Sequence, residues 1–243
     1  KRQVDPQWRP LAEAAGCAAW LNQQSLWSRG DDQTFEDYLK GFNANQRRNI
    51  KRERKAVAKA GITVTPLSGD QLDLDLLQTM HRFYEQHCAR WGPWGSKYLE
   101  EGFFEALARL HRDQLVLFSA HRGDPRDPVA MSMCVQDGRQ LWGRYWGSHE
   151  EIDCLHFEVC YYAPIEWALA NGIVCFDPGA GGSHKRRRGF VARPHASLHR
   201  WYQPQMDQLI RTWLPRVNDL MLEEIDAINA EPVSYTHLTL PTK

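Results

Sequence analysis

The stretch that decides the fold runs from Leu141 to Phe190 and contains LWGRYWG (141–147), LHFE (155–158), IVCFDPGAGG (173–182) and HKRRRGF (184–190). The first segment predicts a strand, the second opens an apolar helix, and the third predicts another strand. This last strand leads into a glycine-rich turn that is followed by four consecutive cations. We therefore expect the chemistry of the chain in this strand–helix–strand unit.

The composition allows a sizeable core but indicates no partner. The chain has 243 residues, 42% of them hydrophobic, and its 30 Lys and Arg residues balance 30 Asp and Glu residues. The six cysteines form no CxxC pair, and no apolar run reaches the roughly 18 residues that a membrane span needs. We expect reduced thiols, no metal site, no membrane span and a cytoplasmic protein.

Three ranges are expected along the chain. Residues 34–232 are predicted to form one domain, and residues 1–33 to be a remnant of a preceding domain or linker. The sequence VSYTHLTLPT (233–242) resembles a translated adapter from sequencing libraries, so residues 233–243 are interpreted as an artefact. The first residue is not Met, and we expect an N-terminal portion to be missing.

The hydrophobic pattern predicts alternating groups of strands and helices. Helices are expected to begin at Thr34 (ending at Gly61), after Ser68, after Ser96, near His156 and near Met206. Strands are expected at residues 62–67, 115–120, 129–136, 141–147 and 173–177. Before Thr34, a short helix (12–21) and an extended segment (23–27) are expected. This order predicts the α/β class, with a mixed sheet covered by helices on both faces, and it matches a GNAT-like acyltransferase domain.

Arg144 is the most unusual residue of the central strand. Strand alternation would place Trp142, Arg144 and Trp146 on one face, and Gly143, Tyr145 and Gly147 on the other. Burying an unpaired guanidinium costs several kcal/mol, so Arg144 needs a counter-charge. This is either a ligand carboxylate or phosphate, with glycines that let a substrate approach, or a structural ion pair, for example to Glu158.

His156 and Glu158 open the following helix. Either could accept a proton from an attacking amine. The alternative is a histidine of the core and a carboxylate stabilised by the helix dipole.

The turn after residue 178 lacks both the P-loop and the Rossmann pattern. Its glycines, Gly181 and Gly182 among them, would let backbone N–H groups converge on an anion, and the cations from Lys185 to Arg188 would hold phosphates. A solvated basic loop is the alternative. The six cations between Arg47 and Lys55 likewise suggest either a polyanion track or a solvated helix.

Four motifs resemble the bacterial FemAB-like family: RRNIKRERKAV (47–57), GRYWG (143–147), LHFEVCYY (155–162) and GAGGSHKRRRGF (179–190). The resemblance covers roughly residues 35–228. Members of this family are GNAT-fold N-acyltransferases or peptidoglycan biosynthesis proteins. Full members are similar to a pair of GNAT-like domains, so the resemblance implies that an N-terminal GNAT-like domain precedes this chain.

The resemblance implies an acyl- or aminoacyl-transferase. Related Fem enzymes move an aminoacyl group from aminoacyl-tRNA to an amine of a peptidoglycan precursor. The implied co-substrate is acyl-CoA or aminoacyl-tRNA, and no tightly bound cofactor is implied. A non-catalytic module that binds tRNA or another polyanion, and an inactive GNAT-like scaffold, are the alternatives.

The resemblance also implies a role for each site residue. Lys185 would stabilise the oxyanion, and Glu158 or His156 would accept the proton. The substrate would be bound by Arg144, Tyr145, Trp146, His184, Arg188, Gly181 and Gly182. The chain departs from the family at His184, which replaces an aromatic residue, and at Pro164 inside a helix. In the acetyl-CoA turn pattern that starts at Arg144, His149 replaces a small residue. We expect Arg144 and Lys185 to converge on one solvent-reachable cavity.

Overall fold

The computed structural model describes residues 8–95, 97–179 and 183–230, which belong to two compact units. The larger unit spans Trp27–Gly179, and the smaller one combines Lys1–Leu26 with Ala180–Lys243. The domain boundary expected at residue 33 stays a prediction. The expected artefact at 233–243 lies outside the described residues, as do Ser96, Gly181 and Gly182.

The larger unit is built on a mixed sheet, as the sequence predicts. Its strands lie in the order β2 (Thr63–Ser68), β3 (Leu115–His121), β4 (Pro128–Asp137), β5 (Gln140–Ser148) and β6 (Cys175–Asp177). The first four pair antiparallel, and β6 pairs parallel to β5. Short turns join β3 to β4 and β4 to β5, which is why these strands fall within one residue of their expected bounds.

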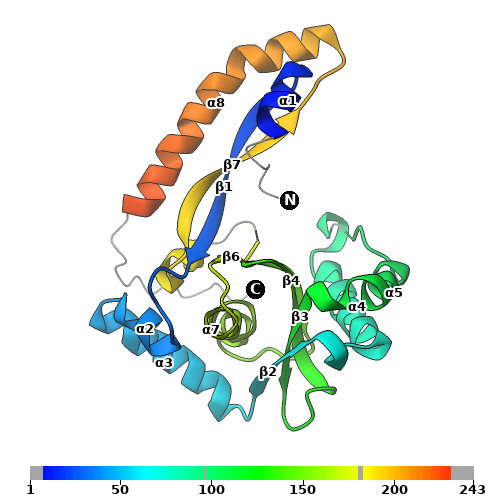
Figure 1. Cartoon of the computed structure of the whole chain (residues 1–243), viewed down its shortest axis with the longest axis vertical. Coiled ribbons are helices and arrows are strands. Elements are labelled where there is room, and N and C mark those ends of the chain that lie inside the picture. Colours follow the sequence, from blue (N-terminus) through cyan, green and yellow to red (C-terminus); the bar gives the residue numbers. More distant parts are fainter. Residues whose placement is uncertain (1–7, 96, 180–182, 231–243) are drawn as a thin grey trace. The chain divides into compact units, whose positions relative to one another are not determined.

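Helices cover both faces of this sheet (Figure 1). On one side lie α4 (Leu74–Ala89) and α5 (Glu101–Leu110), which share a buried apolar cluster with the sheet. The other side carries α6 (Leu155–Phe157), a π-helical turn (Glu158–Tyr162) and α7 (Ala163–Ala170). The Ser132 hydroxyl of β4 donates to the Val159 carbonyl at 2.8 Å, which ties the π-helical turn to the sheet.

The helix expected from Thr34 to Gly61 is in fact two helices, α2 (Phe35–Lys40) and α3 (Ala44–Lys59). The capping box of Thr34 with Asp37 is confirmed. The chain ends α2 at Gly41 and starts α3 with Asn43, whose side chain accepts the Gln46 N–H. An N-cap asparagine two residues after a glycine is a restart signal that the continuous run of cations obscures.

Two expected helix features also take a different form. Ser68 caps only a 3₁₀ turn (Gly69–Gln71), and Asp73 is the residue that caps α4. Pro164 is the second residue of α7, where a missing N–H costs little, and the π-helical turn directly precedes it. The helical run thus changes from a π-helical turn to an α-helix just before Pro164.

The smaller unit contains α1 (Trp8–Ala14), most of β1 (Ala18–Ser28), β7 (Val191–His199) and α8 (Pro204–Ala230). β1 pairs antiparallel with β7 from Ala18 opposite His199 to Leu26 opposite Val191. The helix expected at 12–21 is wrong in its second half, and β7 was not expected at all. Neither strand alternates cleanly between apolar and polar residues, so periodicity gives little signal for them.

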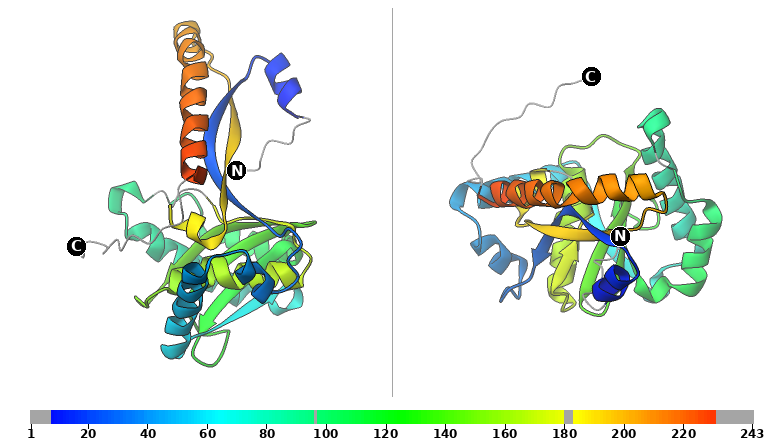
Figure 2. Two further views of the ribbon diagram at one scale, coloured as in Figure 1. Left: turned by 90° about the vertical axis from the view of Figure 1, so that its left-hand side faces the viewer. Right: turned by 90° about the horizontal axis from the view of Figure 1, so that it is seen from above.

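Helix α8 runs alongside β1 and β7 (Figure 2) and is held by polar side chains as well as by apolar ones. Asn218 accepts the Leu21 N–H at 2.9 Å and donates to the Ala19 carbonyl at 3.0 Å. Asn229 makes the equivalent pair of bonds with Ala192. Among the described residues, no helix combines the length and the apolar content needed to cross a membrane.

Candidate functional site

Arg144, which belongs to the larger unit, lies at a β-bulge between β4 and β5. Met133 of β4 lies opposite Tyr145, and the next residue, Cys134, lies opposite Gly143. Arg144 is thus the extra residue of β5, with no partner in the ladder. A bulge redirects the side chain of its extra residue, and bulges are frequent next to active sites.

The bulge overturns the expected alternation. Trp142 pairs with Val135, whereas Trp146 pairs with Ser132, so the two tryptophans lie on opposite faces of the sheet. The prediction that they flank Arg144 on one face is therefore wrong. One inserted residue shifts the two-residue period, and a single sequence does not reveal the insertion.

The bulge lies where β5 and β6 separate. The parallel pairing ends at Trp142 opposite Asp177, while β5 continues to Ser148. Beyond this point β5 has no strand partner on that side within the described residues. The carboxyl ends of parallel strands are a common place for ligand sites in α/β sheets.

The two glycines of β5 make room for neighbouring protein backbone, and not for a substrate as the sequence suggested. A Cβ atom on Gly143 would lie 3.3 Å from the Pro178 backbone. On Gly147 it would lie 2.3 Å from the Phe83 carbonyl oxygen of α4. The two glycines thus let the Pro178 and Phe83 backbones pack directly against β5 on either side of the bulge.

A cavity of about 80 Å³ lies at this separation. It is lined by Ser132, Met133, Cys134, Gly143, Arg144, Tyr145, Trp146, His156, Cys160, Tyr161 and Pro178. This volume accommodates only a few non-hydrogen atoms, since one water molecule occupies about 30 Å³ in the liquid. The cavity can therefore hold the reacting end of a substrate.

The Arg144 side chain is available to a ligand. It is half-buried, and it makes no hydrogen bond or ion pair with any residue that the structure describes. Burial raises the pKa of the Cys134 thiol beside it, and the Arg144 charge opposes that shift. The thiol stays neutral, so it supplies no counter-charge to Arg144.

His156 reaches the same cavity from α6. Its ring centroid lies 4.7 Å from that of Trp146 and 5.2 Å from that of Tyr161, which forms an aromatic wall. The structure thus brings His156, Arg144, Tyr145 and Trp146 together, as the proposed site requires.

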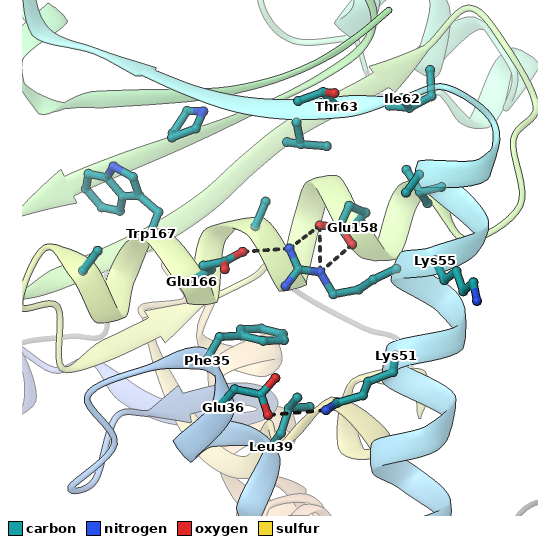
Figure 3. A pocket seen from close by; sticks show the side chains of 17 residues that line it. Phe35, Glu36, Leu39, Lys51, Lys55, Ile62, Thr63, Glu158, Glu166 and Trp167 are labelled. Carbon is teal, nitrogen blue, oxygen red and sulfur yellow. Dashed lines mark hydrogen bonds and ion pairs between the residues drawn. The ribbon is translucent and has the colours of Figure 1, made fainter.

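Glu158 faces away from this cavity. Both of its carboxylate oxygens accept from Arg54 Nε at 3.1 Å, and Oε1 also accepts from Arg54 Nη2 at 2.9 Å. Burial raises the pKa of the Glu158 carboxyl, and the Arg54 charge opposes the shift. The suggested ion pair of Arg144 with Glu158 is therefore wrong, because Arg54 takes its place. Glu158 instead lines a larger cavity on the other side of the π-helical turn (Figure 3).

Three residues at or near the site were not predicted from the sequence: Cys160, Tyr161 and Arg54. Cys160 and Tyr161 line the small cavity because the π-helical turn changes the helical period, and no sequence signal marks that change. Arg54 does have a signal. It lies four residues after Ile50 and three before Val57, which are both buried, so it shares their helix face.

The cationic turn belongs to the smaller unit. Residues 183–188 form a 3₁₀ helix in which Lys185 is 3% exposed and Arg188 is 4% exposed. Arg188 Nη1 donates to the His184 carbonyl at 2.8 Å. A fully solvated loop is therefore wrong for these two residues, although Arg187 is exposed. The expected convergence of Lys185 with Arg144 joins residues of two units and stays a prediction.

His184 gives this turn a pH dependence. Burial first, then the charges of Arg188 and Lys185, lowers the pKa of His184 to about 4. Between about pH 6.5 and pH 4, the His184 side chain is therefore protonated in the unfolded chain but neutral in the folded protein. Because the unfolded state binds more protons in this window, the free energy of unfolding falls as the pH drops through it. We expect His184→Gln to remove about 1 kcal/mol of that fall at pH 5, after allowance for solvent screening.

Urea denaturation at pH 7 and pH 5 measures this effect, with His199→Gln, an exposed histidine of β7, as the matched control. Identical pH dependence in the wild type and in His184→Gln would contradict the assignment.

Comparison with known proteins gives a fold and a family. Two solved structures share the fold: L-PGS from Bacillus licheniformis (TM-score 0.54) and the C-terminal DUF2156 domain of a proposed lysylphosphatidylglycerol synthetase from Agrobacterium fabrum (TM-score 0.58). Each is 11% identical in sequence, and each match covers 86% of this chain and 70% of the other. No curated protein matches the sequence.

The family profile, described as peptidoglycan biosynthesis/recognition, matches residues 2–235. That range includes nearly the whole chain, together with the bulge, the π-helical turn and the cationic turn. The protein therefore belongs to the FemAB-like family.

Proposed function

We propose that the protein is an acyl- or aminoacyl-transferase of the GNAT/Fem type, with an amine of a peptidoglycan precursor as the acceptor. The observation that carries the proposal is Arg144, held at a bulge beside a small cavity with no counter-charge from the residues that the structure describes. The reaction class is inferred from the membership of the protein in the FemAB-like family, because a shared fold alone does not fix a reaction.

In the proposed reaction the acceptor nitrogen attacks the carbonyl carbon of an ester or thioester. A C–N bond forms, the C–O or C–S bond breaks, and the tRNA hydroxyl or the CoA thiol leaves. His156 takes the proton from the nitrogen, and Lys185 stabilises the oxyanion of the tetrahedral intermediate. Arg144 and Arg188 bind an anionic part of the substrate. Glu158 has no role as a base, because Arg54 occupies its carboxylate.

The described residues argue against acyl-CoA as the donor. The residues that would form the acetyl-CoA turn, from Arg144 onward, belong to β5 up to Ser148. A strand does not present the converging backbone N–H groups that hold a pyrophosphate. We therefore infer that the donor is an aminoacyl ester.

The two alternatives lose support. The scaffold interpretation rests on a pair between Arg144 and Glu158, which does not form. The polyanion-binding interpretation of α3 is weakened because Arg54 forms ion pairs with Glu158 and Glu166. Lys51 likewise lies 3.4 Å from the carboxylate of Glu36. Two of the six cations between Arg47 and Lys55 therefore already have acidic partners, which weakens their binding of phosphates.

The test is a transfer assay. The protein is incubated with a peptidoglycan precursor and either tRNA charged with isotope-labelled amino acids or labelled acetyl-CoA, and mass spectrometry detects the new amide. We expect an amide from aminoacyl-tRNA only. Lys185→Met, which roughly preserves side-chain volume, should lower kcat by about 100-fold, while Arg187→Ala at the exposed neighbour should stay within about twofold of wild type.

No amide from either donor would overturn the proposal. A wild-type rate in Lys185→Met would remove the oxyanion role. Thermal unfolding of each variant shows whether a loss of rate reflects a loss of fold.

A further inference from the structure

A second and much larger cavity lies wholly within the larger unit. It is about 790 Å³ in volume and is bounded by α2, α3, β2, the π-helical turn and α7 (Figure 3). Cavities of roughly 300–1,000 Å³ are typical of small-molecule sites. The catalytic proposal uses none of the chemistry of this cavity.

Most of its wall is apolar. The contributing side chains include Leu39 of α2, Val57 of α3, Val64 of β2, and Ala163 and Trp167 of α7. Such a surface favours a ligand with a hydrocarbon body, because each buried CH₂ group stabilises binding by about 0.8 kcal/mol.

The charges in the cavity are unevenly shared. Arg54 bonds to Glu158 on the π-helical turn and, at 2.7 Å, to Glu166 on α7. Two carboxylates therefore share one guanidinium, so this group of three side chains has one formal negative charge, although the lining as a whole has as many cations as carboxylates. Of the other two cations, Lys51 lies 3.4 Å from Glu36, and Lys55 points away from the two glutamates (Figure 3).

Glu166 carries the accessible part of this negative charge. Its side chain is 52% exposed, and Arg54 binds Oε2. Oε1 accepts no hydrogen bond from the residues that the structure describes. The Trp167 ring lines the same cavity, as does the Phe35 ring, over which the Arg54 guanidinium lies 4.4 Å from the centroid. A carboxylate with a free oxygen in a cavity that an indole ring also lines is well suited to an ammonium group.

We propose that this cavity binds a primary ammonium group carried on an apolar chain, with the ammonium at Glu166 and the chain against the apolar wall. Charge complementarity at Glu166 selects this class over an anion, since Arg54 is already bonded to two carboxylates, Lys51 lies beside Glu36, and Lys55 points away from the two glutamates. The proposal is independent of the transferase function.

Isothermal titration with two probes of equal chain length tests this inference. Hexylammonium should bind the wild-type protein at least tenfold more tightly than hexanoate. Glu166→Gln should weaken hexylammonium binding about tenfold, and Glu166→Lys should reverse the preference. The matched control is Glu105→Gln, an exposed carboxylate of α5 outside the cavity, which should bind as the wild type does.

Three results would overturn the proposal: no binding of hexylammonium, equal or tighter binding of hexanoate, or unchanged hexylammonium binding in Glu166→Gln. Because the readout is binding and not amide formation, failure here leaves the transfer assay unaffected, and failure of the transfer assay leaves this result unaffected.

Discussion

Arg144→Ala is expected to lower kcat/KM for amide formation by about 100-fold or more, which corresponds to about 2.7 kcal/mol. Arg144 has no protein counter-charge among the described residues, so its interaction energy remains available to the substrate anion. A charge-assisted bidentate hydrogen bond in a confined cavity is among the stronger polar contacts that a site can make. Since this contact exists before and during the reaction, most of the loss should appear in KM.

The neighbouring arginine offers a matched control. Arg139 lies in the exposed turn between β4 and β5, donates to the Gly172 carbonyl and lines neither cavity, so Arg139→Ala should keep the wild-type rate. Arg144→Lys keeps the charge but loses the planar fork, and it should fall between the wild type and Arg144→Ala. Equal rates in Arg144→Ala and Arg139→Ala would show that Arg144 does not touch the substrate.

The second large effect is on stability. Arg54→Ala should lower the free energy of unfolding by about 2–3 kcal/mol, because it leaves the Glu158 carboxylate, only 6% exposed, without its three hydrogen bonds. Arg54 is itself 29% exposed, which places the value below that of a fully buried pair. Urea denaturation at pH 7 measures it, and Arg48→Ala at an exposed position of α3 should change the value by about 0.5 kcal/mol or less.

The pH dependence gives this prediction a sign. Burial already raises the pKa of Glu158, and removal of Arg54 removes the charge that opposes the shift. A group whose pKa is higher in the folded state stabilises the protein as the pH falls. The deficit of Arg54→Ala relative to wild type should therefore shrink between pH 7 and pH 5. A deficit that grows in that range would contradict the assignment, as would a double variant Arg54→Met/Glu158→Met no more stable than Arg54→Ala.

The sequence predicts the core of the sheet well, since β3, β4 and β5 have strong apolar patterns and short turns between them. It also predicts the mixed topology and the helices on both faces. It places an extended segment at 23–27, inside β1, but it misses the first half of β1 and all of β7, which pair with each other over a long separation in the chain. Local periodicity contains no information about such a pair.

The candidate site shows a similar division. The residues at 144–146 and His156 do line one cavity, because they belong to a strand and a helix that the pattern identifies. The direction of Trp142 and the partner of Glu158 were missed for two reasons. An inserted residue at the bulge shifts the strand period, and the salt bridge to Arg54 joins residues 104 positions apart. Both depend on tertiary geometry, which only the folded structure supplies.

The central claim is that Arg144 binds an anionic group of the substrate where β5 and β6 separate. A crystal structure of the protein with its transfer product tests it most directly. We predict a carboxylate or phosphate oxygen of the product about 2.7–2.9 Å from the Arg144 guanidinium, with the new amide beside His156. A product bound elsewhere, with no ligand atom in contact with Arg144, would contradict the account.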